Sequence, residues 1–127
     1  MAATSSLYAN SESVFVERIF SESTTWTPSS SCRAYVTVIG PGGSGAHARG
    51  TSAEDVYAAS GGGGGGCAKS LLTLSSAVTY TITIGAGGAT ASAANGNPGH
   101  TDGTTFVGSD ITDMTGEPGA GGLQAIA

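Results

Sequence analysis

Residues 35–43 read Y-V-T-V-I-G-P-G-G, and residues 80–88 repeat this pattern as Y-T-I-T-I-G-A-G-G. Alternating β-branched and aromatic residues are typical of strands, and glycines mark the positions where strands end. The repeat therefore predicts two strands that each run into a glycine turn, with positive φ or a close backbone approach at the glycines. The glycines assigned to these structural turns are Gly40, Gly42, Gly43, Gly85, Gly87 and Gly88.

Glycine dominates the chain after residue 39. It supplies 22 of the 127 residues, with none before Gly40, against a usual share of about 7%. One run stands out as a polyglycine loop, which consists of Gly61, Gly62, Gly63, Gly64, Gly65 and Gly66. Such a run is either a flexible linker or a set of chains packed side by side in a polyproline-II-like form, because no side chain holds them apart. A predicted strand follows the run directly, which favours packing.

Few residues of the chain are charged. Charged residues make up 10% of the sequence, against roughly 25% in an average soluble domain, and the net charge is −5. The four Lys and Arg form no basic stripe, so we expect no nucleic-acid partner. This composition suits a small β domain that contacts copies of itself or lies inside a larger assembly.

The N-terminal sequence is polar and has no apolar core of a signal peptide, and no apolar run is long enough to span a membrane. We expect neither a signal peptide nor a membrane span. Cys32 and Cys67 allow a single disulfide, but two small buried hydrophobic residues are the favoured interpretation.

Short strands are predicted along the rest of the chain. Residues 67–74 and 79–84 are expected to form a hairpin in which Tyr80, Ile82 and Ile84 face the core. Residues 14–20 form either a strand or a short helical turn, and residues 51–60 are weakly helical. The predicted strands are residues 14–20, 33–39, 67–74, 79–84, 104–107 and 111–115.

Many short strands separated by glycine-rich segments, with almost no helix, predict an all-β fold. We expect an antiparallel β-sandwich, jelly-roll-like, with long glycine-rich loops. Apolar side chains occur on both faces of the predicted strands at residues 33–39 and 67–74, which is typical of strands covered on both faces. Two regions are expected: a polar N-terminal arm at residues 1–12, for attachment or flexible, and a glycine-rich β domain at residues 13–127.

No motif in the sequence predicts catalysis. Gly40, Gly42 and Gly45 match the G-x-G-x-x-G dinucleotide fingerprint, but no amphipathic helix follows them. His47 and His100 lack metal-ligand spacing, and no G-x-S-x-G nucleophile elbow is present. We therefore expect no catalytic residues, no cofactor, no metal site and no enzymatic activity.

The order of these motifs resembles the glycine-rich domain of bacteriophage tail-fibre and related virion proteins. Its pattern is a Trp and Pro lead-in, a V-T-V-I-G-x-G-G strand, a polyglycine loop, a Y-T-I-T-I-G-x-G-G strand, a G-x-x-T-x-F-G unit and a closing T-G-G-x-G tract. The sequence departs from it where Val107 separates Phe106 from Gly108 and where the closing tract reads T-G-E-P-G. The matching residues are 26–28, 36–43, 61–66, 72–88, 103–108 and 114–122.

The resemblance implies a structural component of a phage virion, in a tail fibre or similar appendage, that contributes to host attachment. It also implies a homo-oligomer, with a trimer favoured, other virion proteins as partners, and assembly in the host cytoplasm. One alternative is a capsid-surface fibre or decoration protein that docks through its polar arm. Another is a carbohydrate-binding adhesin module, with Tyr8, Trp26 and Tyr57 stacking on sugar rings and a host-surface glycan as ligand.

Overall fold

The computed structural model describes residues 15–48, 57–91 and 95–126, and this part of the chain is all-β with antiparallel strand pairs. The predicted fold class is thereby confirmed. The strands are β1 (Thr24–Trp26), β2 (Cys32–Ile39), β3 (Tyr57–Ala59), β4 (Cys67–Leu74), β5 (Tyr80–Thr83), β6 (Thr104–Val107), β7 (Met114–Gly116) and β8 (Gln124–Ile126).

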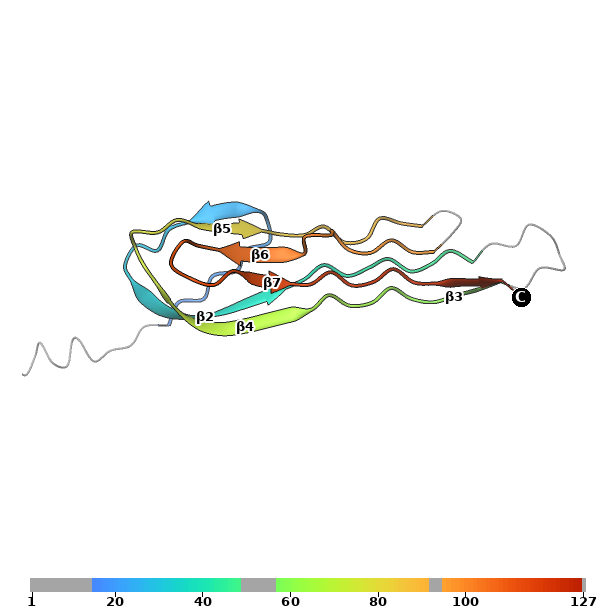
Figure 1. Cartoon of the computed structure of the whole chain (residues 1–127), viewed down its shortest axis with the longest axis horizontal. Helices are drawn as coiled ribbons and strands as arrows, with labels where there is room; N and C mark the ends of the chain where they lie inside the picture. Colours follow the sequence, from blue (N-terminus) through green and yellow to red (C-terminus); the bar gives the residue numbers. More distant parts are fainter. Residues whose placement is uncertain (1–14, 49–56, 92–94, 127) are drawn as a thin grey trace, which may run out of the picture.

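Two sheets face each other at one end of the molecule in a sandwich-like arrangement (Figure 1). The larger sheet has the order β1-β5-β6-β7, and the smaller one pairs β2 with β4 over their full lengths. Strand β2 contacts β6 and β7, and β4 contacts β7, so the small sheet covers only one half of the large one. A jelly roll has two four-stranded sheets, whereas the second sheet here has two strands.

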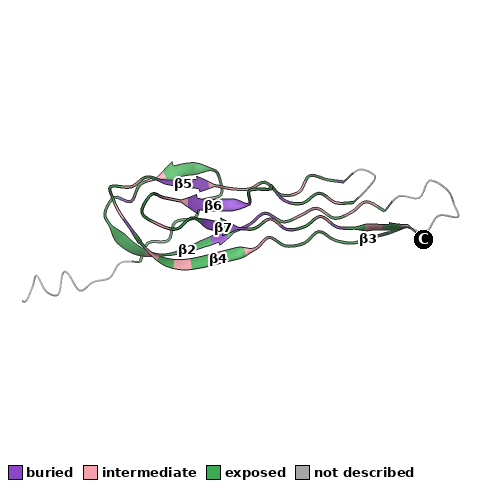
Figure 2. Ribbon diagram, in the orientation of Figure 1, coloured by how far each residue is buried: buried purple, intermediate pink, exposed green. Residues whose placement is uncertain are grey.

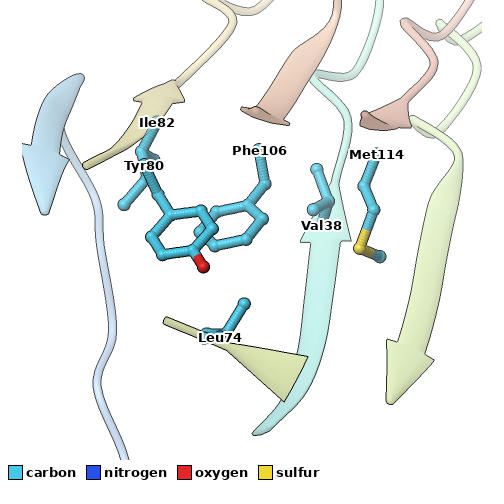
Figure 3. Close-up of a cluster of buried hydrophobic side chains, with 6 residues drawn as sticks. All are labelled: Val38, Leu74, Tyr80, Ile82, Phe106 and Met114. Carbon is cyan, nitrogen blue, oxygen red and sulfur yellow. The ribbon is translucent and has the colours of Figure 1, made fainter. Parts of the chain in front are cut away.

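The core lies between these two sheets, where the buried residues of Figure 2 concentrate. Tyr80 is fully buried, and its ring stacks on Phe106 with centroids 5.2 Å apart. Val38 of β2 lies between Phe106 and Met114 (Figure 3). The buried cluster consists of Val38, Leu74, Tyr80, Ile82, Phe106 and Met114.

The predicted hairpin between residues 67–74 and 79–84 is wrong. Strand β4 pairs with β2, whereas β5 pairs with β1 and β6, so the connection between β4 and β5 crosses from one sheet to the other. The crossing is fixed because Leu74 and Tyr80 both point into the core and the amide of Ser75 donates to the Tyr80 hydroxyl at 2.8 Å. The inward orientation predicted for Tyr80 and Ile82 is confirmed.

Two other predictions differ from the structure. Residues 15–20 contain no strand and no helical turn, and they leave Phe15 and Ile19 exposed. The weak helix prediction falls mainly on residues 51–56, outside the described residues, and Tyr57–Ala59 forms β3 instead. The polar arm at residues 1–12 also lies outside the described residues.

One face of the small sheet is uncovered in the single chain. Tyr35 is 83% exposed, and Ile39 and Leu71 are also exposed on the same side, while Val38 and Leu74 point into the core. The cover predicted for both faces of residues 33–39 is therefore present on one face only. Within the described residues no helix is long and apolar enough to cross a membrane.

Candidate functional site: the glycine rod

Five extended segments leave the sandwich side by side and run toward the far end, where β3 pairs with β8 (Figure 1). We call this bundle the glycine rod. Two segments continue directly from β2 and β5, and the others connect the remaining strands. The segments are residues 40–48, 60–66, 85–91, 95–102 and 117–123.

Backbone hydrogen bonds between segments hold the rod together, and they recur at every third residue. Between the first two segments, the donors are residues 40, 43 and 46, and the acceptors are residues 66, 63 and 60. A polyproline-II helix has three residues per turn and no internal hydrogen bonds, so each turn offers one amide in the same direction. The bonds are Gly40 N to Gly66 O at 2.7 Å, Gly43 N to Gly63 O at 2.9 Å and Ala46 N to Ser60 O at 3.0 Å.

The segment of residues 117–123 closes a triangle with the first two. Its carbonyls accept from the amides of the polyglycine segment, including Gly63 N to Ala120 O at 2.8 Å. Its own amides donate to residues 40–48, including Gly119 N to Pro41 O at 2.7 Å. Three helices that each bond both neighbours form the centre of the rod.

The two remaining segments are also attached to this centre by backbone hydrogen bonds. Residues 95–102 donate to residues 117–123 through Gly96 and Gly99, again three residues apart. Residues 85–91 attach through the amide of Gly88, which donates to Gly42 O at 2.9 Å, and through Ala86 O, which accepts from His100 N at 2.8 Å. Every segment of the rod is therefore tied to at least two others.

The polyglycine run is packed rather than a free linker. A Cβ on Gly62 would overlap the carbonyl oxygen of Gly43, and one on Gly65 would overlap the carbonyl oxygen of Gly40. At Gly61 and Gly64 nothing lies within 4 Å of the added atom. The steric demand thus has the same three-residue period as the hydrogen bonds, because one side of each helical turn faces a neighbour.

The glycines assigned to turns lie in straight extended backbone. Residues 40–43 and 85–88 continue the direction of β2 and β5 into the rod (Figure 1). Among the described residues positive φ occurs at Gly103 alone. Close backbone approach is the reason that applies: a Cβ on Gly43 would overlap Ala120 O, and one on Gly88 would overlap Asn97 O.

Side-chain hydrogen bonds add to the rod near its far end. The amide of Asn97 donates to Ser44 Oγ at 2.9 Å, and its side-chain amide donates to Ala89 O at 2.9 Å. The amide of Leu123 donates to Ser60 Oγ at 2.8 Å. These small polar residues fasten neighbouring segments of the rod.

The polar residues that could carry chemistry are scattered. His100 and Asp102 approach to 4.0 Å on the surface, and the described residues contain no cluster of three or more His, Cys, Asp or Glu. Tyr80 donates to Asp110 Oδ2 at 2.9 Å. Burial raises the pKa of the Tyr80 hydroxyl, and the Asp110 carboxylate adds to the rise. This tyrosine belongs to the core of the sandwich.

The two cysteines are free and exposed, contrary to the favoured interpretation as buried residues. Cys32 lies opposite Leu74 and Cys67 lies opposite Ile39, at opposite ends of the β2–β4 ladder. The ladder therefore keeps the two thiols apart.

The aromatic residues proposed for sugar stacking are not brought together. Trp26 packs between Phe20 and Tyr80, with centroid distances of 6.0 and 6.2 Å. Tyr57 lies in β3 at the far end of the rod, half-buried, and Tyr8 is outside the described residues. Trp26 is thus part of the sandwich and not a displayed ring.

Sequence reasoning found the polyglycine run and the G-x-G-G repeat but missed the rod. The missed residues are those of the other segments, such as Gly96, Gly99, Gly119 and Gly122, which meet the first two segments across the bundle. Their signal is a three-residue spacing of glycines, G-N-P-G and G-A-G-G, in separate parts of the chain.

Comparison with known proteins gives one family. The family model described as a glycine-rich domain matches residues 19–127. No curated protein and no solved structure matches the chain.

Proposed function

Because the chain belongs to the glycine-rich domain family, we propose that it is a structural component of a bacteriophage virion, in a tail fibre or a similar appendage. The observation that supports this is the glycine rod, which extends from the sandwich and is bonded along its length. A polyproline-II helix rises about 3.1 Å per residue, twice the rise of an α-helix. A bundle of such helices gives a long, stiff projection from a short chain.

The rod suits an appendage because its rigidity depends mainly on the backbone. Backbone hydrogen bonds join all of its segments, and its glycines let the helices approach closely. The sandwich is the base in this proposal, and the far end, with β3 and β8, is presented outward and contributes to host attachment. Assembly takes place in the host cytoplasm, with other virion proteins as partners.

Immunogold electron microscopy of phage particles tests this function, using antibodies against the recombinant chain. Label on the tail or its fibres is the expected result. Label on the head would instead support the alternative, a capsid-surface fibre or decoration protein. Purified particles that carry no label, with the chain present only in the unassembled fraction, would overturn the virion role.

We further propose that the chain is a homo-oligomer, with a trimer favoured by the resemblance to phage fibres. The uncovered face of β2 and β4 supplies the contact: Tyr35 lies opposite Leu71, Ile39 lies opposite Cys67, and all four side chains are exposed. Exposed apolar patches on small domains mark interaction surfaces. Burial of this face would stabilise each copy by mass action.

Sedimentation equilibrium at micromolar concentration measures the oligomeric state. We expect a trimer for the natural sequence and a folded monomer for Tyr35→Asp, which places a charge in the contact. Thr81→Asp, on the exposed face of the other sheet, is the matched control and should remain a trimer. A cooperative, folded monomer of the natural sequence would contradict the proposal.

A further inference from the structure

One edge of β2 has no partner strand. Strand β2 pairs with β4 along one side, and no backbone hydrogen bond joins its other side to any described residue. Alternate residues of an antiparallel strand point their N–H and C=O groups away from the paired neighbour, so a row of donors and acceptors faces outward here. An open strand edge of this length is a template for another strand.

A groove follows this open edge. Its volume is about 1020 Å³, and every residue of β2 (Cys32–Ile39) borders it. Ile82 and Phe106 of the large sheet, with Ile84 just after β5, line its floor, and residues 15–20 line the opposite wall. It therefore occupies the place of a third strand in the small sheet, over the uncovered half of the large sheet.

The volume of the groove is enough for a short strand. Strands in packed sheets are about 4.8 Å apart, the sheets are about 10 Å apart, and each residue adds about 3.3 Å, so one strand residue takes roughly 160 Å³. By this measure the groove holds about six residues. The opposite wall carries exposed apolar side chains, with Phe15 96% and Ile19 82% accessible, and an occupant would bury them.

We propose that this groove binds an extended, apolar strand with acidic ends, donated by a different protein, which adds to the free edge of β2. Main-chain hydrogen bonds to β2 would provide affinity. Alternate side chains of the bound strand would pack on the apolar floor of the groove, as in other cases of strand addition. This inference concerns the sandwich and does not depend on the virion role.

The charge around the groove selects acidic ends. Arg18 and Arg33 border the groove together with a single acid, Glu17, and Lys69 lies opposite Thr37 on the neighbouring strand. Two of the four cations of a chain with net charge −5 thus border the groove, and a third lies on the next strand. Carboxylates at the ends of a bound strand would complement them.

Residues 15–20 of the chain itself do not fill this place. Phe20 packs on Trp26 of β1 at 6.0 Å between ring centroids, and the Arg18 guanidinium carbon lies 6.0 Å from the same ring. These contacts hold the segment against the large sheet as the wall of the groove. It makes no backbone hydrogen bond to β2.

A second copy also fits poorly through its own β2. Pairing two β2 edges antiparallel in one continuous sheet would bring the two large sheets to the same side. The half formed by β1 and β5 extends beyond β2, so these sheets would collide. A single extended segment meets no such obstacle.

Fluorescence polarisation with synthetic peptides tests the proposal on the full chain. The probe is a labelled peptide of alternating valine and threonine with aspartates at both ends. Two control peptides have the same sequence with N-methylated amides. One is methylated on the amides along one edge of the extended peptide, and the other on the amides along the opposite edge. We expect saturable binding of the probe, abolished by methylation of the edge that faces β2 and retained with methylation of the opposite edge.

The charge preference is tested by a swap. Arg33→Glu should lower the affinity for the aspartate-ended peptide by roughly tenfold. The same variant should bind a lysine-ended peptide more tightly than the natural chain does. Circular dichroism of the variant checks that it is folded.

Three outcomes would overturn the proposal. The first is no saturable binding by any peptide, and the second is equal binding of both methylated forms. The third is a concentration-dependent dimer of the natural chain in which the amides of residues 32–39 become protected from hydrogen exchange. That last result would assign the groove to a second copy.

Discussion

The amide of Gly63 donates a hydrogen bond to the carbonyl oxygen of Ala120 at 2.8 Å. This bond joins two segments that lie far apart in the sequence, and the carbonyl of Gly63 accepts at the same time from Gly43 at 2.9 Å. Gly63 thus links the three central helices of the rod through its own peptide groups. The rod is stable only where helices can approach to hydrogen-bonding distance, and this condition decides which glycines can be replaced.

Alanine substitution along the polyglycine run should have effects with a period of three residues. Gly62→Ala and Gly65→Ala place a Cβ against the backbone of residues 40–43, so a whole helix must move. Overpacking of this kind costs about 1–3 kcal/mol. Gly61→Ala and Gly64→Ala meet open space and should change stability little, or raise it by about 0.4–1 kcal/mol by restricting the unfolded chain.

Urea denaturation of the four single variants measures this pattern. Gly61→Ala and Gly64→Ala are the matched controls, because they make the same chemical change in the same run. Equal losses of stability at all four positions would contradict the three-residue period and mean that no position in the run accommodates a side chain. Equal tolerance at all four would mean that the segment is not packed in solution.

The strands of the sandwich were predictable because burial imposes a period of two on their side chains. Residues 67–74 and 104–107 match β4 and β6 at both ends, and the burial of their side chains alternates along each strand. The hairpin prediction failed because a short polar connection fits both a hairpin and a crossing between sheets. The contact of Ser75 with Tyr80 that selects the crossing is a tertiary one.

The glycine rod was predictable only in part. The absence of side chains in residues 61–66 indicated that helices could pack there, but not which neighbours they would meet. That depends on pairings such as Gly96 with Gly122, which no local pattern specifies. The predicted strand at residues 14–20 failed for a related reason, because Phe20 and Arg18 pack on Trp26 of the large sheet and take the segment away from β2.

In the G-G pair that ends each G-x-G-G repeat, the second glycine should be more sensitive to substitution than the first. Gly43→Ala and Gly88→Ala would force a Cβ into the backbone of a neighbouring helix. A Cβ on Gly42 or Gly87 would instead lie 3.5 or 3.6 Å from the nearest atom, which is an ordinary contact distance. We expect losses of about 1–3 kcal/mol for the former pair and small effects for the latter. Thermal unfolding followed by circular dichroism distinguishes them, and a Gly42→Ala variant as unstable as Gly43→Ala would refute this assignment.

The two faces of β5 should differ in their response to truncation. Ile82 is buried in the core cluster, and Thr81 beside it in the sequence is exposed. Ile82→Ala removes buried methyl groups and leaves a cavity, which costs roughly 2–5 kcal/mol, while Thr81→Ala should cost far less. Denaturant titration of both variants gives the free energies of unfolding. Similar losses would mean that the outer face of β5 is covered in the assembled protein.

Stability should fall as the pH rises above about 10 because of Tyr80. Burial raises the pKa of its hydroxyl, with a further contribution from the Asp110 carboxylate, which accepts its proton at 2.9 Å. The unfolded chain therefore releases this proton at a lower pH than the folded chain does. The stabilisation is fully present below the unfolded pKa and is lost as the pH rises through the folded one.

Urea denaturation between pH 7 and pH 11 measures this loss in the natural chain and in Tyr80→Phe. The variant should be less stable at neutral pH, because the Ser75 amide and Asp110 lose their partner at the core, yet its stability should depend less steeply on pH above 10. Tyr35→Phe, which alters an exposed ring, is the matched control and should keep the steep dependence. If Tyr80→Phe and the natural chain lose stability in parallel above pH 10, the folded state does not hold the Tyr80 proton more tightly than the unfolded state.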